Sequence, residues 1–351
     1  MERRPFGYRR PGGMRPAAFL SGALLLAALF APGPAAHALE AWASATGTYA
    51  LNGMPLGVTV WAKDQASAGQ ALAAVAAEAE RLHQQYSPLR PGSMVSLLNQ
   101  TTGEKPVTVD LETLSLLQWA LKLAGKTSGA LDPTTAAFKW QYGFRQQEYH
   151  VPTDLRLDQI KTMVSYTFLD LYPKDRIVLF KRQGMQIDLD DILVNYALNR
   201  LRQAAKGTEA GRLDLGPNLA VWGRPPDAKT WREPIRDPKD RKQILAVVDL
   251  NRGRLLSAGV FEKIFEQDGL AYYPYLDPRT GKPARHSQGG TLLLPEQPKL
   301  ELPASALMLL PPEQAVALVE SIPGAECLIK DAAGKIWLSR GWARTLALAG
   351  K

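Results

Sequence analysis

The chain has 351 residues and a single cysteine, Cys327. No disulfide can therefore form within the chain, so its stability has to come from a buried apolar core. Hydrophobic residues make up 46% of the sequence, which is enough to build one large domain or two subdomains. We expect one sizeable domain.

The N-terminus has the pattern of an export signal. Arginines between Arg3 and Arg15 precede an apolar run over residues 17–31, and Ala36-His37-Ala38 follows as a cleavage motif. The run is shorter than the roughly 20 residues that a membrane-spanning helix needs. We therefore predict a cleaved signal over residues 1–38, a periplasmic domain over residues 39–351 and no stable membrane anchor. Arg3-Arg4 leaves the twin-arginine export route open.

The charge gives little support for a nucleic-acid partner. The formal net charge is +8, and five arginines and one glutamate before residue 39 contribute +4 of it. The remainder shows no stripe of Lys and Arg with interleaved aromatics, which excludes nucleic-acid binding as the main function.

Helical and strand patterns alternate along the rest of the chain without a clean repeat. We predict a hairpin over residues 46–62 around Asn52-Gly53, and a helix that begins at Asp64 or Ser67 and ends near Tyr86. The other predicted helices begin at Asp110, at Asp190 or Asp191, at Gly259 and at Pro312. Predicted strands cover residues 176–180, 185–189, 244–248, 292–294, 327–330 and 336–339, and residues 217–238 are predicted as a loop. This mixture predicts an α+β fold with mixed α/β layers and two interleaved subdomains.

Four short segments carry the functional signal. They are Ser87-Pro88-Leu89-Arg90-Pro91-Gly92-Ser93 with Ser96 and Asn99, Ser128-Gly129-Ala130-Leu131-Asp132-Pro133-Thr134 with Gly143-Phe144, Ile187-Asp188-Leu189, and Leu276-Asp277-Pro278-Arg279-Thr280-Gly281. In this order they resemble the FAD:protein FMN transferases of the ApbE family. The resemblance implies the fold of this family and an Mg²⁺-dependent enzyme that transfers FMN from FAD to a threonine or serine of an exported partner protein.

The resemblance also implies site residues. It assigns Asp277, Arg279 and Thr280 to catalysis. It assigns flavin-nucleotide binding to Asp188, Gly216, Ser257, Gly259 and Gly281. Asp-Pro-Arg-Thr-Gly is also a good turn on propensity alone, so a purely structural role stays open.

The phosphate-binding turn departs from the family pattern. Two glycines and a lysine follow Ile-Asp-Leu in the family, and Asp190, Asp191 and Val194 stand here. Bare backbone and a cation suit a pyrophosphate, whereas two carboxylates repel it. We expect Asp190 and Asp191 to cap a helix and face water rather than to bind metal.

Other departures affect the base and its surroundings. The family's histidine before Asp-Pro-Arg-Thr-Gly is replaced by Pro274, and Pro217 and Asn218 replace a glycine and an acid. None of His83, His150 and His286 takes the place of the lost histidine. The expected base and phosphate cradle are therefore both altered.

The resemblance places Mg²⁺ on the Leu193 carbonyl and on the side chains of Glu301 and Ser305. Residues i and i+4 share a helix face, and these oxygens are ligands that Mg²⁺ prefers. Pro303 requires the pair to lie in a first helical turn.

The preferred interpretation is a family member with a degraded site and slow or no activity. One alternative is an active transferase that uses Glu301, Ser305 and Arg279 in a rearranged site. The other is a module that binds flavin or a partner without chemistry.

Overall fold

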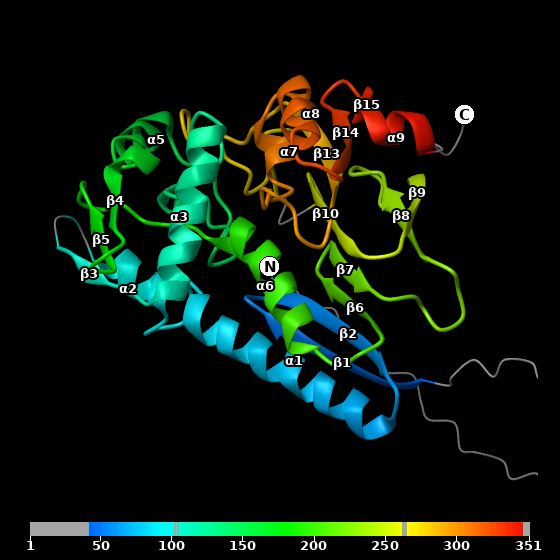
Figure 1. Cartoon of the computed structure of the whole chain (residues 1–351). Coiled ribbons are helices and arrows are strands. Elements are labelled where there is room, and N and C mark those ends of the chain that lie inside the picture. The colour runs from blue at the N-terminus through cyan, green and yellow to red at the C-terminus, as the bar shows by residue number, and fades with distance from the viewer. Residues whose placement is uncertain (1–41, 102, 104, 262–264, 347–351) are drawn as a thin grey trace, which may run out of the picture. The chain divides into compact units, whose positions relative to one another are not determined.

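The computed structural model describes residues 42–101, 103, 105–261 and 265–346, so the predicted signal lies outside the described residues. One large antiparallel sheet organises the domain (Figure 1). Its strand order is β1 (Ala43–Leu51), β2 (Met54–Ala62), β6 (Ala210–Leu215), β7 (Asn218–Trp222), β10 (Gly253–Gly259), β13 (Ser287–Leu294), β14 (Glu326–Asp331) and β15 (Ile336–Leu338).

Smaller sheets and helices complete the fold and confirm the predicted α+β class. The smaller sheets are β3 (Val107–Thr108), β5 (Ile177–Phe180) and β4 (Leu169–Tyr172), then β8 (Trp231–Arg236) with β9 (Ile244–Leu250), and β11 (Phe265–Gln267) with β12 (Leu270–Tyr272). The helices are α1 (Gln65–Tyr86), α2 (Met94–Gln100), α3 (Leu111–Lys126), α4 (Ala136–Gln141), α5 (Asp154–Lys161), the 3₁₀ turn Tyr166–Phe168, α6 (Asp190–Ala204), α7 (Ala306–Leu309), α8 (Pro312–Glu320) and α9 (Arg340–Thr345).

The first hairpin forms as predicted. Asn52 and Gly53 both have positive φ, 49° and 80°, which gives the turn the twist that joins two antiparallel strands. Alternate residues of β2 are buried, among them Leu56, Val58 and Val60. The period of two therefore turns one face of the strand into the core.

The large sheet is covered on both faces. Helix α1 packs on β1, β2 and α6, and α6 packs on β6 and β7, so the two helices cover one face (Figure 1). On the other face, Trp231 and Ile235 of β8 and Val248 of β9 form a second core with Leu219 and Leu255 of the sheet. Among the described residues, no helix is both long and apolar enough to cross a bilayer.

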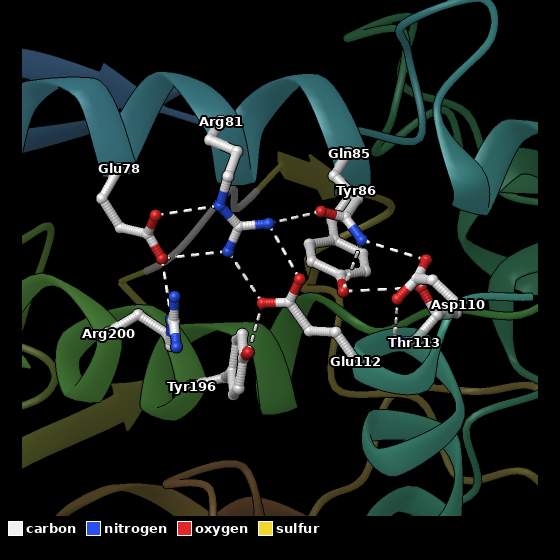
Figure 2. Close-up of polar contacts among 9 residues, drawn as sticks. All are labelled: Glu78, Arg81, Gln85, Tyr86, Asp110, Glu112, Thr113, Tyr196 and Arg200. Carbon is white, nitrogen blue, oxygen red and sulfur yellow. Dashed lines mark hydrogen bonds and ion pairs between the residues drawn. The ribbon is translucent and has the colours of Figure 1, made fainter.

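A polar network joins α1, the start of α3 and α6 (Figure 2). Arg81 lies at its centre, with Nε 2.9 Å from Glu78 Oε2 and Nη2 2.7 Å from Glu112 Oε1. Arg200 donates to Glu78 over 2.7 Å, and the Tyr196 hydroxyl donates to Glu112. Burial would raise the pKa of Glu112, but Arg81 and Tyr196 lower it. The network sets the position of α6 against its neighbours.

The same network reaches the cap of α3. Gln85 donates to Asp110 over 3.1 Å and to the Tyr86 hydroxyl over 3.0 Å. Asp110 accepts from the Thr113 backbone over 2.8 Å and thereby caps α3, as predicted. Burial raises the pKa of the Tyr86 hydroxyl, which stays protonated at neutral pH.

The predicted strand at residues 185–189 is wrong. The segment makes a single parallel bridge, between Gln186 and Thr135. The Asn99 side chain satisfies the Ile187 backbone instead, because its amide donates to the carbonyl over 3.0 Å and its oxygen accepts from the N–H over 2.7 Å. One side chain thus takes the place of a neighbouring strand.

The predicted loop at residues 217–238 and the helix starting at Gly259 are also wrong. Residues 217–238 contain β7, which is buried throughout, and β8. Pro234 is tolerated in β8 because, within the described part of the chain, that strand has β9 as its single neighbour. Gly259 ends β10, and residues 262–264 lie outside the described part of the chain.

We expect Leu82→Ala to lower the free energy of unfolding by about 2–5 kcal/mol, because this side chain on the inner face of α1 is fully buried and its loss leaves a cavity. Leu155→Ala is the matched control, since 71% of that leucine is exposed, and its effect should stay within about 0.5 kcal/mol. Urea denaturation measures both values. Equal losses in the two variants would contradict this description of the core.

Candidate functional site

A cavity of about 260 Å³ lies where segments distant in the sequence meet. Its wall includes the β1–β2 turn, the first turns of α6, the β6–β7 turn and part of β10. Residues 274–275 and 303–305 complete the lining. Concave sites at which several elements converge are where proteins usually bind small ligands.

A second cavity of about 380 Å³ adjoins the first and shares Asn52, Gly53 and Arg145 with it. It is lined by residues 87–91, the first of the four motif segments, and by His83. An elongated ligand can therefore extend through both cavities.

Five charged side chains surround the start of α6. Lys139 Nζ lies 2.6 Å and Arg145 Nη2 lies 2.7 Å from Asp188 Oδ2, and Arg145 also forms an ion pair with Asp190. Asp191 is the fifth charged residue of this group. Lys139, Arg145, Asp190 and Asp191 line the first cavity, and Asp188 does not. The two cations come from α4 and the turn after it, so their ion pairs connect that part of the chain to the start of α6.

The pKa shifts in this cluster follow from burial opposed by charge. Burial alone would raise the pKa of Asp188, but Arg145 and Lys139 outweigh it and lower the pKa. Burial would lower the pKa of Lys139, and the charge of Asp188 raises it. Burial raises the pKa of Asp191, and the charges of Asp188 and Asp190 add to the shift, although Lys139 opposes it. Asp188 is therefore ionised between two fixed cations at neutral pH.

The expectation that Asp190 and Asp191 cap a helix and face water is wrong. Leu189 is the N-cap of α6, and the capping carboxylate belongs to Asp188, whose Oδ1 accepts from the Asp190 N–H over 2.9 Å. Asp190 and Asp191 lie in the first turn, half-buried in the cavity wall. Their side chains turn inward because Arg145 and Lys139 provide counter-charge there.

Of the residues expected to bind flavin nucleotide, Gly216 and Ser257 line the first cavity. The Ser257 N–H donates to Asn218 Oδ1 over 3.1 Å, and its hydroxyl lies 3.0 Å from the Thr291 hydroxyl. Asp188 lines a small cavity that shares lining residues with the first, and Gly259 pairs with Gly289 in the sheet. The structure thus brings part of the set together.

The segment expected to be catalytic forms a turn outside the cavity lining. Both Nε and Nη2 of Arg279 bind the Asp277 carboxylate, at 2.9 and 2.8 Å, and 70% of the arginine side chain is exposed. The Thr280 hydroxyl accepts from the Lys282 N–H over 3.2 Å. Gly281 has φ of 69°, and a Cβ there would lie 2.4 Å from Phe138, so the turn requires glycine. The catalytic role of these residues stays a prediction.

The residues expected to hold Mg²⁺ do not fit the ion. Glu301 precedes α7 instead of lying in its first turn, so it shares no helix face with Ser305. Its carboxylate is bound by Arg254 over 2.7 and 3.0 Å and by Asn199 over 2.9 Å. Ser305 lines the cavity, whereas Leu193 and Glu301 do not. In the described part of the chain, no three His, Cys, Asp or Glu residues are grouped to hold a metal.

The residues that sequence reasoning missed are the cations. Lys139 stands between Phe138 and Trp140, and 11% of its side chain is exposed. A lysine among large apolar residues signals a buried charge, which needs a carboxylate partner. The sequence does not identify that partner, because Asp188 lies far along the chain.

We expect Asp188→Asn to lower the free energy of unfolding at pH 7 by about 3 kcal/mol, because two buried cations lose their shared carboxylate. The lowered pKa of Asp188 means that its contribution is complete above about pH 4 and is lost as the pH falls through that pKa. The difference from wild type should therefore shrink in acid. Urea denaturation between pH 7 and pH 3 measures it. Asp158→Asn, at an exposed pair with Lys161, is the control, and a pH-independent difference for Asp188→Asn would contradict the assignment.

The family model described as the ApbE family matches residues 53–329. The FAD:protein FMN transferase of Treponema pallidum is 29% identical over 258 residues, which cover 68% of this chain and 71% of that protein. The FAD:protein FMN transferase of Escherichia coli K12 is 25% identical over 319 residues, which cover 86% and 89%.

Solved structures show the same fold. The crystal structure of the ApbE protein from Thermotoga maritima has a TM-score of 0.75 at 24% identity and covers 86% of this chain and 99% of its own. The flavin transferase ApbE from Vibrio cholerae has a TM-score of 0.72 at 21% identity, with coverage of 87% and 99%. The motif segments, the fold and the match over most of the chain agree, and the chain belongs to the ApbE family of FAD:protein FMN transferases.

Proposed function

We propose that this chain binds a flavin nucleotide in the two adjoining cavities and transfers FMN to a hydroxyl residue of a partner protein slowly or not at all. The observation that carries the proposal is the composition of the first cavity's wall. Pro274 lines it where the family has a histidine, and none of the described lining residues is a histidine. Transfer of FMN from FAD needs a base for the attacking hydroxyl, and proline cannot act as one.

The charge of the wall is the second argument. Asp190 and Asp191 stand where the family has glycines, and Arg145 and Lys139 offset their charge. The lining is therefore close to neutral, and simple repulsion of phosphate is not the obstacle. A phosphate has instead to compete with Asp188 and Asp190 for cations that are already paired, which weakens binding.

The alternative of an active, rearranged site gains little from the geometry. It requires Arg279 at the phosphate, and that arginine is bound to Asp277 outside the cavity lining. It also requires Glu301 at a metal, and that carboxylate is held by Arg254. A non-catalytic module that binds flavin or a partner is favoured over it, because the cavities persist while the base is replaced.

We expect purified protein to bind FAD with a dissociation constant above about 1 μM and to release little AMP when incubated with FAD and a threonine-containing acceptor peptide. Fluorescence titration and mass measurement of the peptide test this, with MgCl₂ and with EDTA. Pro274→His should raise AMP release if the missing base limits the reaction. Arg340→Met, on the exposed pair with Glu320, is the control. Rapid flavinylation of the peptide by wild type would overturn the proposal.

We further propose that the protein acts in the periplasm after removal of residues 1–38. The support is the pattern of arginines, apolar run and Ala-His-Ala motif. Intact-mass measurement of protein from the periplasmic fraction should give a chain that begins at Leu39. Retention of the full-length chain in the cytoplasmic fraction would contradict this.

A further inference from the structure

Arg254 is a buried cation whose Nη atoms face oxygen acceptors, whereas its Nε has no hydrogen-bond partner among the described residues. It lies on β10, and 3% of its side chain is exposed. Its Nη atoms donate to Glu301 over 2.7 and 3.0 Å, to the Asn195 carbonyl over 3.5 Å and to the Pro295 carbonyl over 3.4 Å. A carboxylate and backbone carbonyls are the ligands that hard divalent cations prefer.

The carboxylate in this group belongs to a segment that is fixed on several sides. Trp119 of α3 donates to the Glu301 carbonyl over 2.8 Å, and Asn199 of α6 donates to its carboxylate over 2.9 Å. Asn195 of α6 donates to the Leu302 carbonyl over 2.9 Å. The next residues, 303–305, line the first cavity, so whatever holds Glu301 also shapes the cavity wall.

We propose that the guanidinium of Arg254 is a built-in cation that takes the place of a divalent metal ion at Glu301. The guanidinium neutralises the carboxylate and binds the surrounding oxygen atoms. A structural metal ion would have the same two effects. Arg254 does not line the cavity, so it makes no direct contact with a ligand there. Arg254 is thus a positioning residue, and the cavity wall keeps its shape without metal.

Only the arginine of this pair is fully buried, since 3% of the Arg254 side chain and 24% of the Glu301 side chain are exposed. Removing a guanidinium from water is costly, and it is offset only when carboxylate geometry is good and other acceptors are present. The fork of Arg254 meets both oxygens of Glu301. The exposed pair of Arg340 and Glu320 fixes nothing comparable, since 79% of that arginine side chain is exposed.

Metal rescue tests the proposal, and no part of it uses flavin. We expect the melting temperature of wild type to be unchanged by about 10 mM CaCl₂, MgCl₂ or EDTA. Arg254→Ala removes the cation and leaves its oxygen acceptors behind, so its melting temperature should fall by about 10 °C. CaCl₂ at about 10 mM should restore several degrees, and MgCl₂ less, because Ca²⁺ accepts irregular oxygen cages more readily.

The controls separate a replaced metal from an ordinary ion pair. Arg254→Ala combined with Glu301→Ala should not respond to CaCl₂, and neither should Arg340→Ala. A wild-type melting temperature that rises with MgCl₂, with loss of the rise in Glu301→Ala, would overturn the proposal, because Glu301 would then bind metal beside Arg254. An Arg254→Ala variant that is destabilised but indifferent to CaCl₂ would also overturn it.

A second pair of variants covers the case in which Arg254→Ala does not fold. Arg254→Lys keeps the positive charge, whereas Arg254→Met keeps only the apolar stem. If the cation is what holds Glu301, the lysine variant should melt several degrees above the methionine variant. Equal melting temperatures would show that the charge contributes nothing and would overturn the proposal.

Discussion

The position of one helix, α6, determines the geometry around the cavity. Its first turn is held by the ion pair of Asp190 with Arg145. Its middle is held through Asn195, which donates to the Leu302 carbonyl, and its last turns through Arg200, which binds Glu78 of α1. Because its apolar face also packs on the large sheet, rotation of α6 would break polar contacts at three levels at once. The part of the cavity wall that α6 forms is therefore held in a fixed position.

The charged groups around α6 support our proposal that the cavity keeps its framework while its chemistry is altered. A pyrophosphate is bound most favourably by free cations and exposed backbone N–H groups. Here Arg145 and Lys139 are present, and Asp188 and Asp190 already occupy them. The ion pairs of these cations hold the start of α6 in place. A ligand phosphate that binds the cations has to replace these ion pairs, so its net gain in binding free energy is small. Structure and affinity therefore compete for the same two side chains.

The sequence was sufficient where local patterns determine the structure. Asn52-Gly53 predicted the first hairpin and Asp110 the start of α3, and Asp64, one of two predicted starts, caps α1, because turns and caps depend on neighbouring residues. It failed where distant residues decide. Residues 185–189 alternate like a strand, but the Asn99 side chain takes their backbone hydrogen bonds. Prolines suggested a loop at 217–238, yet β8 is a strand of a two-stranded sheet that tolerates Pro234.

The candidate site follows the same division. Motif order predicted Gly216 and Ser257 as nucleotide-binding residues, and both line the first cavity. It could not show whether a carboxylate points at a metal, at solvent or at an arginine. Glu301 is the clearest case, since the residue that binds it, Arg254, carries no motif and lies on another element. A single arginine in a buried strand can therefore change the role of a motif carboxylate. Whether such a carboxylate binds a metal or forms an ion pair depends on the residues around it, and the carboxylate alone does not reveal which.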